Sequence, residues 1–295
     1  MPHAAIDRLR RVSSPQNAVV KQLRRAFARS EPTDEGFCAI ESVRIVEEAI
    51  RSGVKFKAVF FSESALPRAH RLLPQIGSHT ETLLLPDDVF SSAVATESPQ
   101  GVAALVELRT TSFEALLAAA TAPQAPTPLL VCVAGLQDPG NLGTILRSAE
   151  AFGAAGVLLG EGTVSPYNSK AVRASAGSLF RLKTASARLE NVLPALRSGG
   201  CRLIATSSHK GMPLAEAKLS DALAFFIGNE GAGLDRNLMA EMDETVVIPH
   251  AARVESLNAG VAASIVLYEI ARQRNLKFSA QQSSGERNTK DQKRN

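Results

Sequence analysis

Short apolar runs alternate with amphipathic stretches from residue 36 onward. Four runs rich in aromatic and branched residues predict strands in the first hundred residues: GFCAI (36–40), FKAVFFS (56–62), ETLLLP (81–86) and GVAALVEL (101–108). The stretch ESVRIVEEAIRSG (41–53) predicts a helix, because Val43, Val46 and Ile50 fall on one helical face and Gly53 lies just past its end. This alternation favours an α/β fold.

A second series of alternating elements begins at residue 129. Its predicted strands are LLVCVAGL (129–136), GVLLG (156–160), FRLKTA (180–185), CRLIATS (201–207), LAFFIG (223–228) and ETVVIP (244–249). Helical stretches separate most of these runs, which is typical of a mainly parallel sheet.

The segment TAPQAPTP (121–128) has three prolines and no hydrophobic period, which indicates a semi-rigid linker. We therefore predict an N-terminal domain over residues 1–120 and a second domain over residues 129–275. The polar residues 276–295 predict a disordered tail.

The composition adds several exclusions. The hydrophobic fraction of 45% is ordinary for a globular protein, and no apolar run is long enough to cross a bilayer, so we expect a cytoplasmic protein. The three cysteines form no CxxC pair, and Cys132 and Cys201 lie in apolar runs that predict buried thiols. The five histidines never pair at metal-ligand spacing, so we expect no metal.

Positive charge is concentrated at the two ends of the chain. The first 29 and last 20 residues carry 12 of the 33 basic and three of the 29 acidic residues, which leaves the body with a net charge of −5. Basic arms on an acidic body favour a polyanionic partner, nucleic acid first, and make Arg24 and Arg25 RNA-binding candidates. The alternative is that these arginines cover a solvated helix face.

The stretch FFIGNEGAGLD (225–235) has the look of a phosphate-binding loop but lacks its chemistry. No lysine follows its glycines as a P-loop requires, and no register gives the Gly-x-Gly-x-x-Gly dinucleotide fingerprint. Glu230 would also repel a phosphate. A ligand with hydroxyls or a positive centre suits the loop better. The alternative is a tight turn in which Glu230 caps the next helix.

A second cluster of polar and glycine residues occupies LQDPGNLGTILRSAEAFGAAGVLL (136–159). Its helix has one apolar face, with Asn141 as a plausible N-cap. Arg147 points about 140° away from the Leu142 direction, so it avoids that face and is free for a ligand or another chain. The alternative is an exposed arginine that pairs with Glu150 one turn on.

A third cluster lies in IPHAARVESLNAGVAASIVLYEIARQR (248–274). A helix is predicted to begin at Glu255 or Ser256 and to be apolar or small on every face from Leu257 to Tyr268. Such a helix must be covered on all sides, and a partner subunit is a natural cover, so we expect a homodimer. Ser256 and Asn258 then stand at the mouth of a buried helix, or only cap it.

Together, NLGTILRSAEAFGA, FFIGNEGAGL and VVIPHAARVESLNAGVAASIVLYEIARQR resemble the three ordered motifs of the SpoU-type (TrmH-like) RNA 2′-O-ribose methyltransferases of the SPOUT superfamily. SPYNSKAVRASAGSLFRL (165–182) resembles the segment between the first two motifs. VATESPQGVAALVEL (94–108) resembles the end of the N-terminal substrate-binding domain in the ribosomal-RNA branch. Three motifs in order are far more specific than any one of them.

The resemblance implies a catalytic α/β domain with a deep trefoil knot, preceded by a small α/β, ribosomal-protein-like RNA-binding domain. It implies S-adenosylmethionine as methyl donor and structured RNA, most of all 23S ribosomal RNA, as substrate. Transfer RNA is the runner-up substrate, and a non-catalytic assembly factor with the same fold is the other alternative.

The family's functional positions fall on residues of all three motifs. The donor-binding positions correspond to Thr206, Gly228, Ile248 and Leu257. The catalytic positions correspond to Asn141, Arg147, Glu230, Ser256 and Asn258. The intervening segment adds Lys170 and Arg173 as RNA-binding candidates.

Three positions depart from the family pattern. SLNAG and His250 differ from the usual third motif, and Ser42 stands where a glycine is usual. Neither departure in the third motif removes a polar motif residue, so these two bear on substrate details rather than on chemistry.

Overall fold

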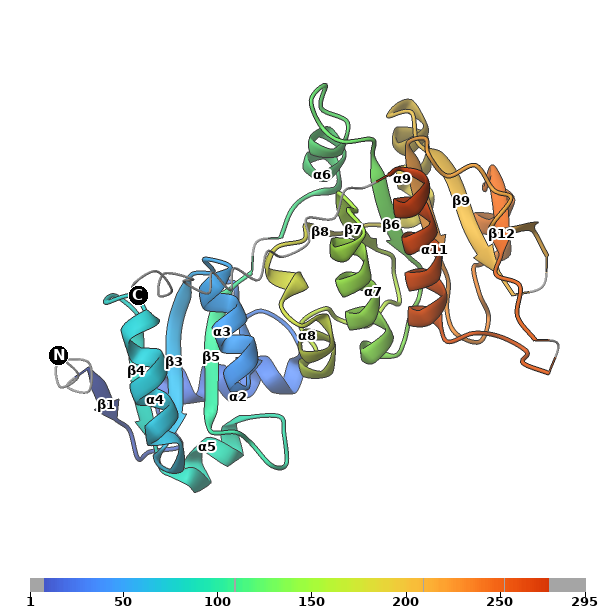
Figure 1. The fold of residues 1–295 in the computed structure, drawn as a ribbon. Coiled ribbons are helices and arrows are strands. Elements are labelled where there is room, and N and C mark those ends of the chain that lie inside the picture. The colour runs from blue at the N-terminus through green and yellow to red at the C-terminus, as the bar shows by residue number, and fades with distance from the viewer. Residues whose placement is uncertain (1–7, 109, 209, 252, 276–295) are drawn as a thin grey trace, which may run out of the picture.

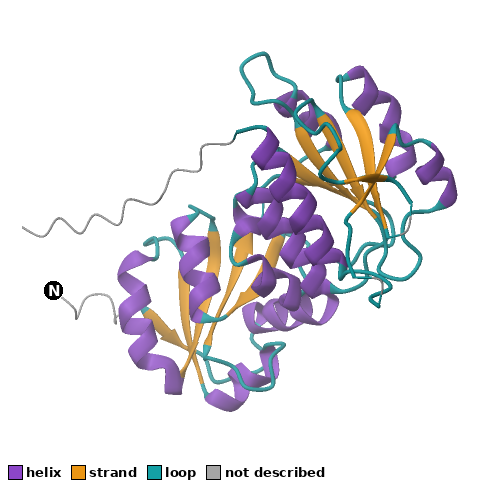
Figure 2. Cartoon of the chain, turned by 45° about the vertical axis from the view of Figure 1, so that its right-hand side comes forward, coloured by secondary structure: helices purple, strands orange, loops and turns teal. Residues whose placement is uncertain are grey.

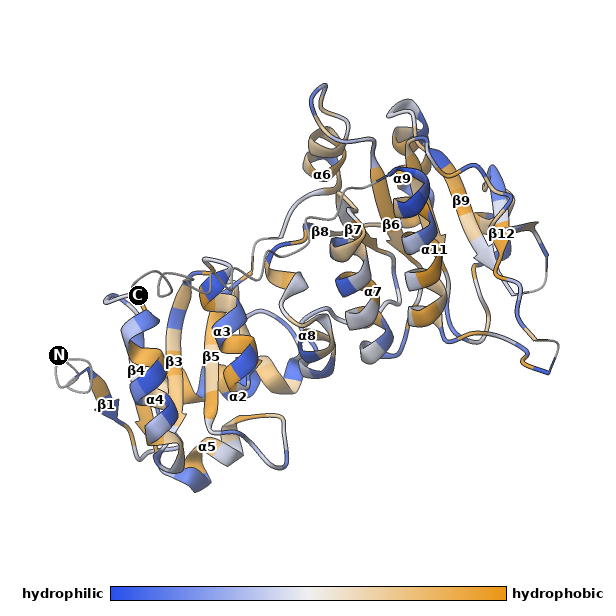
Figure 3. Cartoon of the chain, in the orientation of Figure 1, coloured by the Kyte–Doolittle hydropathy of each residue, from blue (hydrophilic) through white to orange (hydrophobic). Residues whose placement is uncertain are grey.

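The computed structural model of the chain describes residues 8–108, 110–208, 210–251 and 253–275, so the predicted tail lies outside the described residues. The chain forms two α/β units that lie side by side, each built around its own sheet (Figures 1 and 2). The strands of both sheets are predominantly hydrophobic (Figure 3). The predicted α/β class is confirmed.

The first unit has a five-stranded mixed sheet in the order β1-β4-β3-β5-β2. Its strands are β1 (Leu9–Arg11), β2 (Phe37–Glu41), β3 (Phe56–Ser62), β4 (Glu81–Leu85) and β5 (Val102–Glu107). β1, β4 and β3 are parallel, and β5 runs antiparallel to β3 and β2. The four predicted strands are present. β1 has too few apolar residues to show a strand pattern in the sequence.

Four α-helices accompany this sheet within the described residues: α2 (Ala18–Arg29), α3 (Val43–Arg51), α4 (Leu66–Leu72) and α5 (Asp87–Ala93). Short 3-10 turns, η1 (Glu63–Ala65) and η2 (Leu73–Gln75), flank α4. The predicted helix over 41–53 is confirmed as α3, and Gly53 follows it with a φ of 65°.

The second unit has a seven-stranded sheet in the order β10-β12-β9-β11-β6-β7-β8, in which every pairing is parallel. Its strands are β6 (Leu129–Val133), β7 (Gly156–Leu159), β8 (Thr184–Ser186), β9 (Arg202–Ser207), β10 (Met212–Pro213), β11 (Leu223–Ile227) and β12 (Glu244–Val247). The predicted parallel sheet is confirmed. The strand predicted over 180–185 is largely wrong, because Phe180 ends the 3-10 turn η3 (Ser178–Phe180) and only Thr184 and Ala185 join β8.

Helices cover both faces of this sheet: α6 (Phe113–Ala120), α7 (Pro139–Ala151), α8 (Ser169–Ser175), α9 (Leu189–Ser198), α10 (Arg236–Ala240) and α11 (Ala259–Gln273). Successive residues of β6 point to opposite faces. Val131 and Val133 share a core with α7 and α11, whereas Leu130 and Cys132 share one with α6 and α9. α7 and α11 pack against each other on the first face (Figure 1).

The packing of α6 bears on the predicted domain limits. The predicted limits place residues 113–120 in the first domain, since the proline-rich segment follows them. In the structure, Leu116 is fully buried in the core of the second sheet, and a Cβ on Gly156 of β7 would lie 2.5 Å from its side chain. The division at 121–128 stays a prediction, and this packing favours a boundary just before α6.

The two units touch through the loop between β7 and α8. Ser165 Oγ donates a hydrogen bond to the Ser30 carbonyl at 2.5 Å, and α8 packs on β2. Burial raises the pKa of Tyr167, in the same loop, to about 12. The second unit therefore meets the first along a partly buried surface.

Candidate active site

A cavity of about 440 Å³ opens beside the carboxyl ends of β9, β11 and β12. Parallel α/β sheets bind ligands at this edge, and the volume falls in the range of about 300–1,000 Å³ that suits a small molecule. The cavity wall includes all four predicted donor-binding residues: Thr206, Gly228, Ile248 and Leu257. Residues from the end of β9, from the loop after β11 and from the segment between β12 and α11 therefore come together at one concave site.

The loop after β11 folds back on itself tightly. A Cβ on Gly228 would lie 2.2 Å from the carbonyl carbon of Gly233, so no side chain fits there. Asn229 pairs with Gly233 through two backbone hydrogen bonds of 3.0 Å, and its Oδ1 accepts the N–H groups of Gly231 and Ala232. The sequence reading passed over Asn229, although asparagine before a glycine is a turn signal.

Glu230 reaches from this loop to the start of α7. Its Oε1 accepts hydrogen bonds from Asn141 Nδ2 at 3.0 Å and from the Asp138 N–H at 3.2 Å. Burial acts to raise the pKa of Glu230, but these hydrogen bonds outweigh it and hold that pKa below its ordinary value. The alternative role as cap of the next helix is wrong, because Asp235 caps α10 by accepting the Asn237 N–H at 2.8 Å.

α7 begins three residues earlier than predicted. Asp138 is its N-cap and accepts the Asn141 N–H at 2.8 Å, so the prediction of Asn141 as N-cap is wrong. Asn141 instead lies inside the first turn, where its side chain is 8% exposed and is held by Glu230. Lys170 Nζ lies 2.9 Å from Asp138 Oδ2, and this contact lowers the pKa of Asp138. Lys170, an RNA-binding candidate, is therefore already paired with a carboxylate.

Arg147 is exposed on α7 and has no hydrogen bond or ion pair to any residue that the structure describes. The predicted alternative, a pair with Glu150, is wrong, because both carboxylate oxygens of Glu150 bind Arg181, at 2.5 and 2.9 Å. Arg147 does not line the cavity around Gly228. Its guanidinium is therefore available to a molecule outside this chain.

The third motif divides between the cavity and the helix that follows. Ser256 lines the cavity, whereas Asn258 is the N-cap of α11 and accepts the Val261 N–H at 3.1 Å. The helix starts at Ala259, three residues later than the latest start predicted, because Ser256 and Leu257 belong to the cavity loop.

α11 is only partly buried within this chain. Ala263, Val266, Leu267 and Ile270 are fully buried on the α7 side. Val261, Ile265 and Tyr268 are 47%, 36% and 53% exposed. The subunit therefore does not cover all the apolar side chains of this helix, in agreement with the prediction from the sequence. Tyr268 also packs edge-on against Phe152, at 5.8 Å between ring centroids.

The remaining RNA-binding candidates differ in how strongly they are hydrogen-bonded within the described part of the chain. Arg24 donates to the carbonyl of Ser92 and to its hydroxyl, both at 3.0 Å, and so serves the contact between α2 and α5. Arg25 is exposed and has no such bond among the described residues. Arg173 makes a single long hydrogen bond, 3.4 Å, to Thr96 of the first unit.

The charge of the cavity wall limits the ligand. Its described lining contains the carboxylates Glu230 and Glu255 but no lysine or arginine. His250, which the sequence reading noted only as a departure, also lines the wall and holds the Ile248 carbonyl through Nδ1 at 2.8 Å. This environment suits a neutral or cationic ligand and disfavours a phosphate.

The described part of the chain contains neither a cluster of metal ligands nor a membrane-spanning helix. No group of three or more metal-ligating side chains comes together there. No helix among these residues is long and apolar enough to cross a membrane.

The fold and the cavity together define an α/β protein with a cavity of small-molecule size beside a polar cluster, and comparison with known proteins gives the family. The model of the SpoU rRNA methylase family matches residues 128–268, and that of the MRM3-like substrate binding domain matches residues 17–104. The chain belongs to the SpoU rRNA methylase family, so the predicted family is confirmed.

Several relatives match over nearly their whole length. The 23S rRNA (guanosine(2553)-2′-O)-methyltransferase RlmP of Bacillus subtilis is 30% identical over 89% of this chain and 99% of its own. The crystal structure of an AdoMet-bound rRNA methyltransferase from Sinorhizobium meliloti has a TM-score of 0.76 and 28% identity, covering 92% of this chain and 100% of its own. The SpoU methyltransferase AviRb from Streptomyces viridochromogenes has a TM-score of 0.75 and 28% identity, over 88% and 98% of the two chains.

Proposed function

We propose that this protein methylates a ribose 2′-hydroxyl in 23S ribosomal RNA, with S-adenosylmethionine as the donor. The observation that carries the proposal is the cavity in which Thr206, Gly228, Ile248 and Leu257 meet, beside the Glu230–Asn141 hydrogen bond. The name of the Bacillus subtilis relative supports both 23S ribosomal RNA as the substrate and the ribose 2′-hydroxyl as the methylated group. Transfer RNA remains the second substrate class.

The residues of the cavity fit the donor. Tight glycine turns allow close backbone approach to an adenosine. The carboxylates of Glu230 and Glu255 favour a cation over an anion in the same space. When bound, S-adenosylmethionine supplies an electrophilic methyl group on a positively charged sulfur. The wall of this cavity therefore matches the charge and size of the donor.

The residues around the cavity divide the remaining work. Glu230 holds the Asn141 side chain and the N–H of Asp138, the N-cap of α7, in place, which fixes the polar rim of the site. Arg147 cannot accept the hydroxyl proton, because a guanidinium stays protonated in proteins. We assign it the stabilisation of the developing oxyanion, or a hold on the adjacent phosphate.

The dimer and the knot complete the proposal. The exposed residues Val261, Ile265 and Tyr268 support a homodimer that covers α11.

A trefoil knot is supported by the chain path: β11 lies between β9 and β6, β12 lies outside β9, and α11 then returns to α7. An experimentally traced backbone that can be pulled straight from its ends would rule the knot out.

The test of the proposed function is the variant Arg147→Ala. Methyl transfer to ribosomal RNA should fall to background, because charge on the 2′-oxygen is no longer stabilised. The donor affinity, measured by calorimetry, should stay within a few-fold of wild type, because Arg147 lies outside the cavity wall.

Two results would contradict the proposal. Near-normal turnover of Arg147→Ala would remove Arg147 from the mechanism. Absence of donor binding by the unmodified protein would favour the alternative of a non-catalytic assembly factor.

A further inference from the structure

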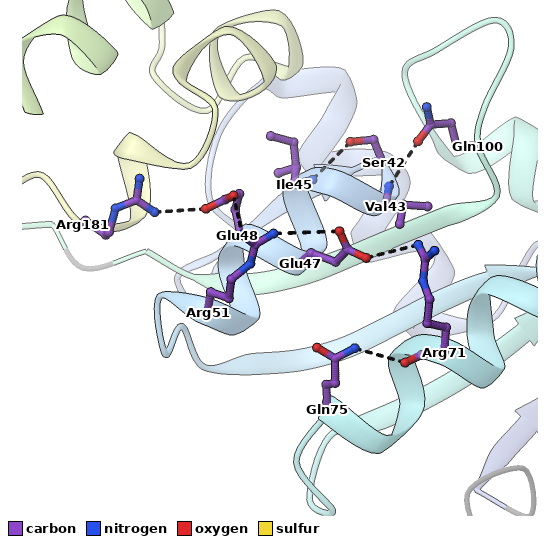
Figure 4. Close-up of polar contacts among 10 residues, drawn as sticks. All are labelled: Ser42, Val43, Ile45, Glu47, Glu48, Arg51, Arg71, Gln75, Gln100 and Arg181. Carbon is purple, nitrogen blue, oxygen red and sulfur yellow. Dashed lines mark hydrogen bonds and ion pairs between the residues drawn. The ribbon is translucent and has the colours of Figure 1, made fainter. Parts of the chain in front are cut away.

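Arg181 joins three elements from both units of the protein. It follows η3, and its Nε and Nη2 bind the two carboxylate oxygens of Glu150 on α7, at 2.5 and 2.9 Å. Its Nη1 also reaches Glu48 Oε2, on α3 of the first unit, at 3.3 Å (Figure 4). The same Nη1 donates to Ser52 Oγ, just past the end of α3, at 3.0 Å. One guanidinium thus bridges the helix that carries Arg147 and the substrate-binding unit.

The contact with α3 is built into the backbone. Gly177 has a φ of 94°, which favours glycine, and a Cβ there would lie 2.8 Å from the Cβ of Glu48. The Glu48 side chain is only 18% exposed. Close approach of the two units therefore places Glu48 against Arg181.

The contact extends further into the first unit. Arg51 lies 3.3 Å from Glu48 and 3.9 Å from Glu47, and Arg71 on α4 lies 3.2 Å from Glu47 (Figure 4). Acidic and basic groups alternate along this chain of contacts. Arg181 is its only member from the second unit among the residues drawn in the figure.

The position of Glu150 matters for Arg147. Residues three apart on a helix are surface neighbours, and opposite charges at this spacing attract. A free Glu150 would therefore compete for the Arg147 guanidinium. In the structure Arg181 occupies both oxygens of Glu150, and Ser178 also donates to it; burial alone would raise the pKa of Glu150, but these bonds lower it.

We propose that Arg181 is a positioning residue for methyl transfer: it holds Glu150 away from Arg147 and, through Glu48, ties this arrangement to the docked substrate-binding unit. The inference rests on the proposed role of Arg147. The bond to Glu150 should then govern turnover, and the bond to Glu48 should govern the affinity for RNA.

The experiment compares steady-state kinetics of four variants with saturating S-adenosylmethionine and a ribosomal RNA fragment. Arg181→Ala should lower kcat about 2- to 5-fold, the range that follows from the strength of an exposed ion pair, and should also raise KM for RNA because the bond to Glu48 is lost. Glu150→Gln should leave kcat near wild type. The double variant Arg181→Ala/Glu150→Gln should recover kcat, because no carboxylate remains to bind Arg147. Glu48→Ala should raise KM for RNA and leave kcat unchanged.

A matched control is Arg188→Ala, which removes another surface arginine, paired with Glu161 at 2.6 Å. It should change neither constant. If Arg181→Ala folds poorly by circular dichroism, Arg181→Lys serves in its place, since an ammonium keeps the charge but cannot form the same two-pronged bond.

The outcomes separate this inference from the function on which it rests. A normal kcat for Arg181→Ala, or a double variant as slow as the single one, would overturn the positioning role while an inactive Arg147→Ala upholds the function. Full activity of Arg147→Ala would overturn the positioning role of Arg181 together with the role assigned to Arg147, whereas absence of methyl transfer by the unmodified protein would overturn the function itself. A merely structural Arg181 would not allow rescue by removing a second charge.

Discussion

Ser42 holds a backbone conformation that side-chain-bearing residues rarely adopt. Its φ is 92°, and it caps α3 by accepting the Ile45 N–H at a long 3.4 Å (Figure 4). Such a conformation costs about 1–3 kcal/mol for a residue other than glycine. The weak cap offsets only part of that cost. Ser42, which stands where the family usually has glycine, is therefore strained at the start of α3.

We predict that Ser42→Gly is more stable than Ser42→Ala by about 1 kcal/mol. Glycine relieves the strain, although it adds about 0.4–1 kcal/mol of chain entropy to the unfolded state. Alanine loses the cap and keeps the strain. Urea unfolding of both variants measures the difference.

Ser112 offers the control for Ser42. It caps α6 at an ordinary φ of −78°, so Ser112→Gly relieves no strain and should lower stability. An alanine variant at position 42 as stable as the glycine variant would show that φ carries no cost there.

The start of α7 shows what single residues reveal in a sequence. The sequence prediction placed the N-cap of this helix at Asn141. Proline is well tolerated at the first position of a helix, however, and Asp138 precedes it as a good cap. The misplaced cap hid the role of Asn141, whose partner Glu230 is 89 residues away.

At the scale of elements, the loop after β11 depends on one close backbone approach. A Cβ added to Gly228 would lie 2.2 Å from the carbonyl carbon of Gly233. A Cβ added to Gly231 would meet only Asn229 Oδ1, at 3.6 Å. Both glycines line the cavity. Only the first of them is required by the fold of the loop.

We predict that Gly228→Ala opens the Asn229–Gly233 pairing and weakens S-adenosylmethionine binding by at least tenfold, which corresponds to about 1.4 kcal/mol. Gly231→Ala should bind the donor within a few-fold of wild type. Calorimetry on both variants tests this, and equal affinities would mean that the loop adapts to the added methyl group.

Elements with strong periodicity were predictable, and those with mixed signals were not. β3 and β11 follow apolar runs closely. Phe180 and Leu182 read as part of a strand, but they pack against the core from a 3-10 turn and the residues after it. A short apolar run cannot by itself distinguish these two structures.

At the scale of the whole molecule, several of the N-terminal arginines already bind groups within the protein. Arg8, Arg10, Arg11 and Arg24 all bond to groups within the first unit. Lys21, Arg25 and Arg29 are exposed without such bonds among the described residues. The cations available to RNA on α2 are therefore fewer than the sequence count.

We predict that the pair Arg25→Gln and Arg29→Gln flattens the dependence of log K for RNA on log salt by about 1.4–1.8, since each phosphate contact contributes about 0.7–0.9. Arg24→Gln is the control and should leave the slope unchanged, because its guanidinium is already bound to Ser92. Superimposable salt plots for wild type and the double variant would mean that α2 is not the RNA-binding surface.

The exposed face of α11 leads to a prediction about assembly. Val261→Asp should convert a dimer to a folded monomer, because an unpaired charge would be buried in the interface but not in the subunit, where Val261 is 47% exposed. Light scattering measures the mass, and circular dichroism checks the fold.

Met212→Asp on β10 is the matched control for Val261, since Met212 is similarly exposed at 43%. Its mass should stay dimeric. A monomeric wild-type protein at micromolar concentration would contradict the dimer outright.

The sequence by itself determined the α/β class, most of the strands and the three motifs, because periodicity and residue chemistry are local properties. Tertiary structure alone decided that α6 packs with the second sheet, that Glu230 binds Asn141, and that Arg181 binds Glu150. These contacts join residues 31 to 89 positions apart, as well as a helix to a sheet across a proline-rich segment. No local pattern encodes such partners, because they follow from the order in which the strands pair and from the side chains that this order brings together.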